Sequence, residues 1–173
     1  SSFDVTAGYD YQYWKATTPL YYEMNTLGEI QKTSKAKDER HVLLSYYGRL
    51  NYSFDSRYML TTTIRRDATS RFAKNVRWGT FPSVALGWRV TEESFLKDNK
   101  VLSNLKIRAS YGVTGQQDGI GNYNYLPIYT QSQNGAEGIM GNEYIHTYRP
   151  SSYVPDLKWE TTTSWNIGFD FGF

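Results

Sequence analysis

The stretch LKWETTTSWNIGFDFGF, residues 157–173, decides the fold class of this chain. Large apolar side chains gather at its odd positions, and its even positions carry small, polar or charged groups. A β-strand turns successive side chains to opposite faces, so the stretch predicts one strand with an apolar and a polar face. Seventeen residues would extend for about 55 Å, against a usual strand of about 5 to 6 residues. That length is expected of a tilted strand that crosses a bilayer and projects beyond it.

The same alternation recurs in five earlier stretches. The stretch from His41 shows it clearly, with Leu43 as the one large apolar exception, and a tight turn at Asp55 and Ser56 joins it to the next stretch in a hairpin. Pro82 weakens the strand in which it falls, because proline lacks the backbone N–H that a central strand needs. The predicted strands cover residues 3–14, 41–54, 57–67, 78–90, 105–114 and 157–173.

The connections between these strands differ in length. Residues 15–40 and 115–156 lose all periodicity and predict long loops, residues 68–77 form a short polar connection, and one helical turn is expected around residues 92–96. If the Asp55-Ser56 turn lies on the periplasmic side, the loops 15–40, 68–77 and 115–156 all lie on the opposite side. Outer-membrane barrels distribute their turns and loops in this way. The sequence therefore predicts an all-β chain, an antiparallel transmembrane β-barrel segment of about six long strands with long extracellular loops.

Composition excludes several classes of function. The net charge is only +2 and the basic residues are scattered, which gives no electrostatic case for a nucleic-acid partner. Cysteine is absent, and with it thiol catalysis and zinc sites of the cysteine type. A mean hydropathy of −0.62 excludes a bundle of membrane helices but not a barrel, because alternating strands average out as polar.

Catalytic and metal chemistry find little support. The two histidines, His41 and His146, are far apart in sequence and have no carboxylate at metal-ligand spacing. We therefore expect no enzyme activity, no metal site and no cofactor. A calcium ion in the loops is a weak alternative, with Asp118 and Asn122, or Asn142 and Glu143, as oxygen ligands.

Three blocks resemble a known family: RRDATSRFAKNVRWGTFPSVALGWRVTEESFLK at residues 65–97, LKIRASYGVTGQQDGIGNYNYL at residues 105–126, and PDLKWETTTSWNIGFDFGF at residues 155–173. In this order they resemble the SusC/RagA family of TonB-dependent outer-membrane transporters of Bacteroidetes. The resemblance implies a 22-stranded barrel with an internal plug, in the outer membrane of a Gram-negative bacterium. It also implies TonB-driven import of glycan oligomers or peptides together with a SusD-like surface lipoprotein, with no chemistry on the substrate.

The resemblance covers only a middle portion of such a barrel. No plug domain, TonB box, additional N-terminal domain or closing strand is recognisable, and six strands are fewer than the eight of the smallest common membrane barrels. An open sheet would leave two unpaired edges in lipid. We therefore expect these residues to be part of a longer chain, in which TonB acts through the plug region.

The two faces then receive different predictions. On the apolar face, aromatic rings are expected near the strand ends, where amphipathic rings settle at the membrane interfaces. On the polar face, charged and amide side chains would either line a hydrated path or, as we favour, brace a plug through ion pairs and hydrogen bonds. The predicted interfacial rings are Tyr46, Tyr58, Trp78, Trp88, Trp159, Phe171 and Phe173. The predicted lumen-facing or plug-facing residues are Arg49, Asn51, Arg65, Asp67, Arg89, Lys106, Arg108, Glu160 and Asn166.

The last long loop is rich in tyrosine, asparagine and glutamine. Aromatic faces stack on sugars or peptides while amides supply hydrogen bonds, so this loop is a candidate for contact with substrate or with the lipoprotein lid. The tyrosines concerned are Tyr123, Tyr125, Tyr129, Tyr144, Tyr148 and Tyr153. Two alternatives stay open: a soluble β-sandwich carbohydrate-binding module, whose aromatic faces would meet in a core, and a passive porin.

Overall fold

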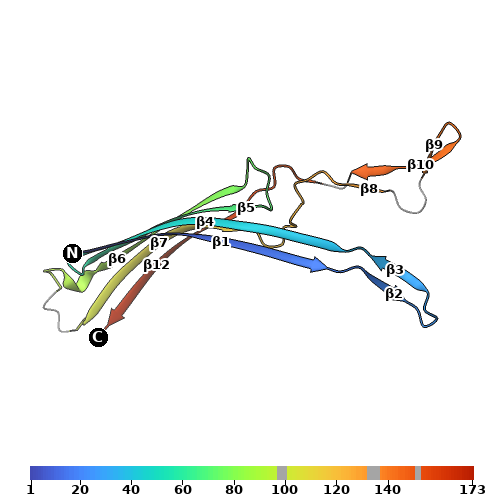
Figure 1. Cartoon of the computed structure of the whole chain (residues 1–173). Coiled ribbons are helices and arrows are strands. Elements are labelled where there is room, and N and C mark those ends of the chain that lie inside the picture. Colours follow the sequence, from blue (N-terminus) through green and yellow to red (C-terminus); the bar gives the residue numbers. More distant parts are fainter. Residues whose placement is uncertain (97–100, 132–136, 151–152) are drawn as a thin grey trace.

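The computed structural model describes residues 1–96, 101–131, 137–150 and 153–173. One antiparallel sheet of six long strands dominates it, in the order β1-β4-β5-β6-β7-β12, so each long strand pairs with the next one along the chain (Figure 1). The prediction of an all-β, antiparallel segment with six long strands is confirmed. The strands are β1 (Ser2–Thr18), β4 (Lys37–Phe54), β5 (Tyr58–Thr69), β6 (Trp78–Arg89), β7 (Asn104–Gln116) and β12 (Glu160–Gly172).

The two long loops contain strands that the sequence did not predict. β1 and β4 pair from Ser2–Ser53 to Thr18–Lys37, well into the predicted loop 15–40, and the short strands β2 (Tyr21–Met24) and β3 (Ile30–Ser34) continue this hairpin. Every residue of β2 is exposed, so neither face has to be apolar and alternation disappears. Within residues 115–156, β8 (Tyr129–Gln131) pairs with β11 (Tyr148–Pro150), and β9 (Glu137–Met140) pairs with β10 (Glu143–His146).

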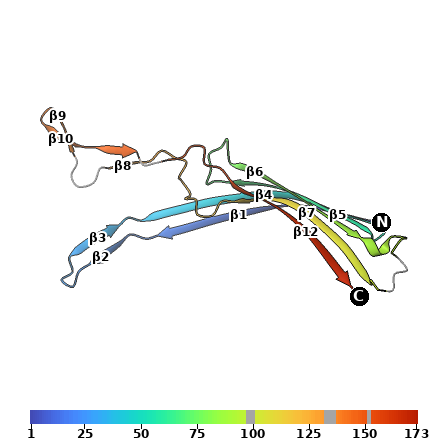
Figure 2. The ribbon, with the colours of Figure 1, turned by 180° about the vertical axis from the view of Figure 1, so that it is seen from behind.

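The sheet has a turn end and a loop end. The turn end carries both chain termini, the β4–β5 turn and the η1 turn (Val90–Glu92), whereas the β2–β3 hairpin and the strands β8–β11 lie at the loop end (Figures 1 and 2). Positive φ angles of 52° and 53° at Asp55 and Ser56 define the tight hairpin turn whose twist matches the flanking strands. The predicted grouping of the loops 15–40, 68–77 and 115–156 at one end is confirmed. The helical turn lies slightly earlier than residues 92–96, and no helix in the described residues is long and apolar enough to cross a membrane.

The strand register sorts the side chains into two faces. One row across all six strands reads Phe3, Tyr52, Leu60, Leu86, Ala109 and Ile167, and we call this side the apolar face. The neighbouring row on the other side, the polar face, reads Asp4, Asn51, Thr61, Ala85, Ser110 and Asn166. Because each row is continuous, the period of two that was read from single strands holds across the whole sheet.

A close fit between β1 and β4 fixes their register on the polar face. Gly8 lies directly opposite Tyr47, whose ring covers the glycine. A Cβ atom at Gly8 would lie 2.6 Å from Cζ of that ring, so a larger residue at this position would displace the ring. An aromatic ring packed over a cross-strand glycine compensates for the side chain that the glycine lacks.

Pro82 lies where the sheet divides. β6 pairs with β7 only from Arg89–Lys106 to Ser83–Gly112, although β6 continues beside β5 to Trp78 and β7 continues beside β12 to Gln116. The Arg89 N–H donates to Arg57 O of the β5 side, so the N–H groups of even-numbered β6 residues point towards β7. Pro82 is the first even-numbered residue beyond Ser83, the last paired residue of β6, and it has no N–H to donate. The β6–β7 ladder therefore ends there, and the two halves of the sheet diverge towards the loop end.

Aromatic side chains fill this fork. Phe72, Phe81 and Trp159 form the main buried cluster, with Phe72 and Phe81 each packed edge-on against Trp159 at centroid distances of 5.6 and 5.3 Å. Edge-to-face geometry at such distances is favourable for aromatic pairs. The core of this sheet is thus a local wedge that replaces missing backbone pairing, rather than a layer between two sheets.

Substituting Pro82 tests this origin of the fork. Pro82→Val restores an N–H that points at β7, and we expect the Val113 amide to exchange about fivefold more slowly as one ladder pair closes. Hydrogen–deuterium exchange on the purified full-length protein measures this. Pro19→Val, in the external hairpin, is the matched control and should leave Val113 unchanged. Unaltered exchange in Pro82→Val would mean that the aromatic wedge, not the proline, ends the ladder.

Candidate functional site

Large side chains on the apolar face are exposed along its whole height. Trp165 is 73% exposed, and Ile167, Phe169 and Phe171 on the same strand are all more than half exposed. Exposed apolar surface of this extent is not stable against water, so the face needs an apolar neighbour. Their rings and aliphatic chains point away from the sheet, and no second layer within the described residues covers them. The apolar face is thus the surface expected to contact hydrocarbon.

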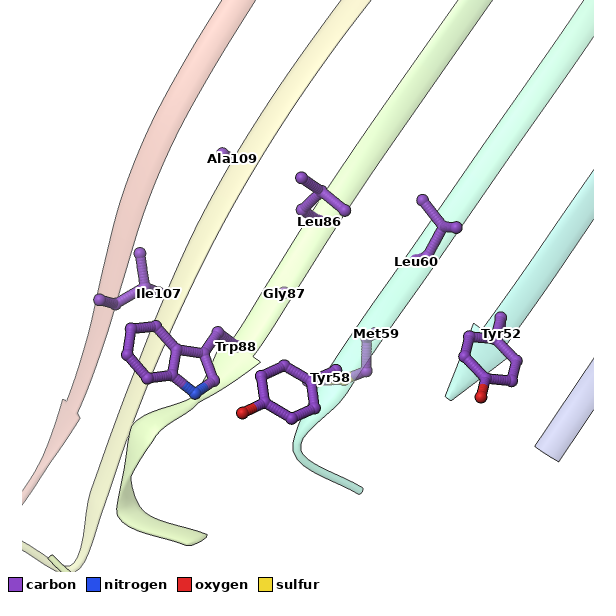
Figure 3. A pocket seen from close by; sticks show the side chains of 9 residues that line it. All are labelled: Tyr52, Tyr58, Met59, Leu60, Leu86, Gly87, Trp88, Ile107 and Ala109. Atoms are coloured by element: carbon purple, nitrogen blue, oxygen red, sulfur yellow. The ribbon is translucent and has the colours of Figure 1, made fainter. Parts of the chain in front are cut away.

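Aromatic side chains with polar tips bound this face at the turn end. The rings of Tyr58 and Trp88 lie side by side there, below Leu60 and Leu86 (Figure 3). Both polar tips reach one carboxylate: Tyr58 Oη donates to Glu93 at 2.6 Å and Trp88 Nε1 donates to it at 3.1 Å. Arg57 Nη1 lies 3.4 Å from the other oxygen of Glu93. The carboxylate thereby ties the rings of two strands to the β6–β7 connection.

A shallow apolar groove lies just above these rings. It has a volume of ≈ 340 Å³ and follows the apolar face across β4, β5, β6 and β7 (Figure 3). Ala109 is small, which hollows the surface between larger neighbours, and Gly87, whose position belongs to the polar face, contributes only backbone. Its remaining lining residues are Tyr52, Tyr58, Met59, Leu60, Leu86, Trp88 and Ile107. Its position and lining suit a lipid chain rather than a polar substrate.

A second set of aromatic residues bounds the face towards the loop end. Tyr46 stacks against Trp78 at a centroid distance of 6.2 Å, and the Arg66 guanidinium lies 5.0 Å from the Trp78 ring centroid. Trp78 and Trp88 are ten residues apart on β6, about 33 Å along a strand and about 25 Å across a bilayer at a tilt of about 40°. This separation matches the height of the apolar band of an outer-membrane barrel.

On the polar face, the predicted residues Arg49, Asn51 and Arg108 make side-chain contacts with neighbouring strands. Arg49 Nε donates to Thr63 Oγ1 at 3.3 Å, and Arg108 Nη2 donates to Asp170 Oδ1 at 2.8 Å. Asn51 links three strands, because it donates to Asp4 at 3.3 Å and accepts from Thr61 at 3.0 Å. Such charged and amide contacts between neighbouring strands make the face a continuous polar surface.

Arg65 and Asp67 form the most enclosed of these contacts. Arg65 Nε donates to both carboxylate oxygens of Asp67 at 2.9 Å, and Arg65 Nη2 donates to Ser45 Oγ at 3.1 Å. Asp67 is 7% exposed and Ser45 is fully buried. A buried carboxylate is stable only when it is paired, so this contact fixes the loop end of β4 and β5.

The remaining predicted residues share the polar face through the register. Arg89 lies opposite Lys106, which in turn lies opposite Asp170. Asn166 lies opposite Ser110, and Glu160 lies opposite Gln116. The structure thus places all nine predicted residues on one face, but spreads them from the turn end to the loop end rather than in one cluster.

A larger groove opens on the polar side at the fork. Its volume is ≈ 700 Å³, and Arg65, Asp67, Phe81 and Trp159 contribute charged and aromatic walls. The segment from Gly112 to Asp118 supplies backbone and amide groups along the other wall. Because it combines apolar side chains, a paired charge and polar backbone, this groove is the best-formed candidate for contact with a polar oligomer or with a plug.

Trp159 corrects one prediction. It was expected on the apolar face, but it is 9% exposed and packs against Phe81, a residue of the polar face. β12 begins at Glu160, so the alternation of the strand does not extend to Trp159 or Leu157. Its Nε1 donates to Arg77 O at 2.9 Å, which joins the start of β12 to the β5–β6 connection.

The connection 68–77 holds residues that the sequence did not single out. Arg71 Nε donates to Asn122 Oδ1 at 3.1 Å, Arg71 Nη1 donates to Gln117 O at 3.0 Å, and the same nitrogen lies 3.9 Å from Asp118. The guanidinium thus contacts Asn122 and lies near Asp118, the two residues considered for calcium, and a calcium site there stays a prediction. No cluster of three potential metal ligands occurs in the described ranges. Only the break in alternation before Trp78 could have drawn attention to this connection.

The six loop tyrosines do not form one site. Tyr123 Oη accepts from the backbone N–H of Arg40 at 3.3 Å, which attaches the loop to β4, and Tyr125 is partly buried. Tyr129 and Tyr148 belong to the β8–β11 pair and Tyr144 to β10, and each is at least 65% exposed. Tyr153, on the connection towards β12, is 45% exposed. One tyrosine thus anchors the loop, and the exposed ones are free to contact another molecule.

These features define a class of protein. An antiparallel sheet with an exposed apolar band between two sets of interfacial aromatics, and a polar reverse face, is the wall of a membrane β-barrel. Comparisons identify the family: the family described as TonB dependent receptor-like, beta-barrel matches residues 2–173. The chain belongs to this family, and the resemblance seen in the three sequence blocks is confirmed. It is a family of receptors and not of enzymes.

Individual relatives agree. The TonB-dependent receptor SusC of Bacteroides thetaiotaomicron is 53% identical over 134 residues, 78% of this chain and 13% of that protein. The TonB-dependent receptor P39 of Formosa agariphila is 37% identical over 150 residues, 86% of this chain and 13% of that protein. The chain therefore spans about 13% of the length of these relatives.

Solved structures give the same fold. The structure of the RagAB peptide importer in the open-open state matches with a TM-score of 0.75 and 26% identity over 98% of this chain and 19% of that one. The structure of the RagAB peptide transporter matches with a TM-score of 0.71 and 27% identity over 98% of this chain and 20% of that one. A soluble β-sandwich would bring the aromatic faces together in a core, whereas the apolar face here is exposed.

The Glu93 contact predicts a dependence on pH. Hydrogen bonds from Tyr58 and, to a smaller extent, Trp88 lower the pKa of Glu93. The charged carboxylate therefore stabilises the folded state above the pKa of the unfolded state, about 4.3, and this stabilisation is lost as acid protonates the folded carboxylate. Glu93→Gln should lower the unfolding midpoint of the receptor at pH 7, and this difference should shrink as acid protonates the folded carboxylate. Denaturant titrations across this range measure it.

Glu92→Gln is the matched control, because it removes an exposed neighbouring carboxylate. It should leave the midpoint at pH 7 nearly unchanged. A Glu93→Gln deficit that persists undiminished at pH 3 would contradict the proposed role of the carboxylate charge.

Trp159 gives a second prediction. Trp159→Phe keeps a ring in the fork but removes the donor to Arg77, and should cost about 1 kcal/mol; Trp159→Ala empties the fork and should cost about 3 to 5 kcal/mol. Trp165→Phe, on the exposed apolar face, should change stability little. Equal effects of Trp159→Ala and Trp165→Phe on the free energy of unfolding would show that the wedge does not stabilise the fork.

Proposed function

We propose that this chain supplies wall and external loops to a TonB-dependent receptor that imports nutrient oligomers, glycans or peptides, across the outer membrane of a Gram-negative bacterium of the Bacteroidetes type. One observation carries the proposal: the sheet has an exposed apolar band on one face and a hydrogen-bonded polar surface on the other. Such a wall separates lipid from a polar lumen. Family membership and the names of the relatives support the same function.

The polar face suggests how the wall takes part. Paired side chains such as Arg65 with Asp67 and Arg108 with Asp170 hold their charges in fixed positions. Fixed charges of both signs can dock a plug in one orientation and still leave a hydrated surface when the plug moves. In this proposal TonB pulls on the plug region, which lies outside these residues, and the wall itself stays rigid.

The loop end suggests where the oligomer is captured. The polar-side groove lies at the fork, and beyond it the exposed Tyr129, Tyr144 and Tyr148 offer ring faces on short hairpins. Ring faces bind sugars and peptide side chains by stacking. A SusD-like surface lipoprotein would cover these loops and close the captured oligomer between lid and barrel. The proposal requires no cofactor, and calcium in the external loops stays a prediction that chelation would test.

Uptake by cells tests the proposal. The full receptor is expressed in a strain that lacks it, with and without functional TonB, and supplied with labelled oligosaccharides or oligopeptides. We expect uptake of one of these classes, and its loss without TonB. Uptake that persists without TonB would favour a passive porin, and a receptor recovered in the soluble fraction would overturn the membrane assignment.

The external loops give a sharper prediction. Tyr144→Ser combined with Tyr148→Ser should raise the KM for uptake about tenfold, because two ring contacts of about 0.5 to 1.5 kcal/mol each are lost. Tyr22→Ser is the matched control, because Tyr22 is an exposed tyrosine on the other external hairpin. Co-purification of the surface lipoprotein, measured in parallel, separates loss of substrate contact from loss of the lid. Unchanged uptake and unchanged co-purification would contradict a role for these two tyrosines.

A further inference from the structure

Arg66 occupies an unusual position for a basic residue. It lies on β5 between Tyr46 and Thr80 in the register, which places it on the apolar face, and it is exposed. Two other basic residues of the six long strands share this face, Lys15 and Arg40, and both lie within 3.4 Å of the Asp38 carboxylate. Arg66 has no carboxylate partner in the described part of the chain. Its guanidinium lies over the Trp78 ring, with Cζ 5.0 Å from the ring centroid.

The described residues therefore leave the guanidinium donors of Arg66 available to an anion. The guanidinium carries five N–H donors and no acceptor, and hydrocarbon cannot satisfy them. Its planar fork matches a phosphate group, which can accept two of these hydrogen bonds at once. Stacking on the Trp78 ring leaves the donors at the edge of the guanidinium plane available for such a ligand.

The depth of Arg66 agrees with this chemistry. It lies eight residues from Tyr58 on the same strand, about 26 Å along the strand and about 20 Å across a bilayer at a tilt of about 40°. Tyr58 lies at the interface of the turn end, so the Arg66 backbone lies two residues inside the level of Trp78 at the opposite interface, and its long side chain reaches the Trp78 ring. Phosphate groups of membrane lipids lie at this level.

The surroundings favour a lipid over a free anion. Tyr46 lies directly opposite Arg66, and Tyr9 lies opposite Tyr46, so two phenol groups lie in the same row as the guanidinium. Ile64 and Gly48 continue the same face towards the membrane centre. We propose that Arg66, with Trp78 and Tyr46, binds the phosphate group of a membrane lipid whose acyl chains pack along the apolar face below it. This inference rests on the proposed membrane-embedded function.

Lipid binding by the full receptor tests the inference. The receptor, stripped of lipid in detergent, is titrated with dioleoyl phosphatidic acid or with dioleoylglycerol, which has the same chains without phosphate, and bound lipid is counted by native mass spectrometry. The wild type should retain the phosphatidic acid, Arg66→Gln should bind it about tenfold more weakly, and Arg66→Lys should fall between them. Arg40→Gln, on the same face but paired with Asp38, is the matched control and should bind like the wild type.

Three results would overturn the inference: equal binding by Arg66→Gln and the wild type, equal binding of dioleoylglycerol, or displacement of the lipid by millimolar inorganic phosphate, which would show a free-anion site. If Arg66→Gln does not fold, Arg66→Lys and the comparison of the two lipids on the wild type still decide. The uptake assay is independent of these measurements. A receptor that imports its oligomer but binds both lipids equally would refute the lipid site and leave the proposed function intact.

Discussion

Backbone hydrogen bonding is the constraint on which this structure depends. In hydrocarbon each unpaired N–H or C=O group is costly, so a spanning strand must be paired along its full membrane length. The ladders of β4 with β5 and of β7 with β12 meet this demand without a break. The β6–β7 ladder does not, because Pro82 removes one donor. The fork opens towards the loop end. There the aromatic cluster and the hydrogen bond from Trp159 to Arg77 O hold the two halves of the sheet together.

The polar side-chain groups are also satisfied by fixed partners on both faces of the sheet. Where the apolar face meets the interfaces, polar tips find fixed partners, as Tyr58 and Trp88 do at Glu93. On the polar face, charged side chains form ion pairs rather than pointing singly into solvent, as Arg65 does with Asp67. Both arrangements hold side chains that would otherwise move, and the result is a wall with two chemically different and well-ordered surfaces.

The period of two made the wall predictable from sequence, because burial on one face imposes a residue type at every second position. Parity alone therefore grouped the nine predicted residues on one face of the sheet, and their contact with a lumen or plug stays a prediction. Alternation gives no signal where both faces of a strand are exposed, as in the hairpin of β2 and β3. The sequence therefore predicted a loop there. Parity also misplaced Trp159, because the residue precedes the regular strand. Arg71 and Glu93 were not identified because their partners, Asn122 and Tyr58, are distant in sequence.

The contact of Gly8 with Tyr47 guards against an error that the alternation cannot detect. A slip of one residue between β1 and β4 would turn every apolar side chain inward and is strongly disfavoured. A slip of two residues keeps each face intact, so hydrophobicity hardly opposes it. Such a slip would set the Tyr47 ring against Thr6 or Asp10, whose side chains would displace it, instead of Gly8, over which it packs. The Gly8–Tyr47 contact thus favours the native register of this long hairpin over registers shifted by two residues during assembly.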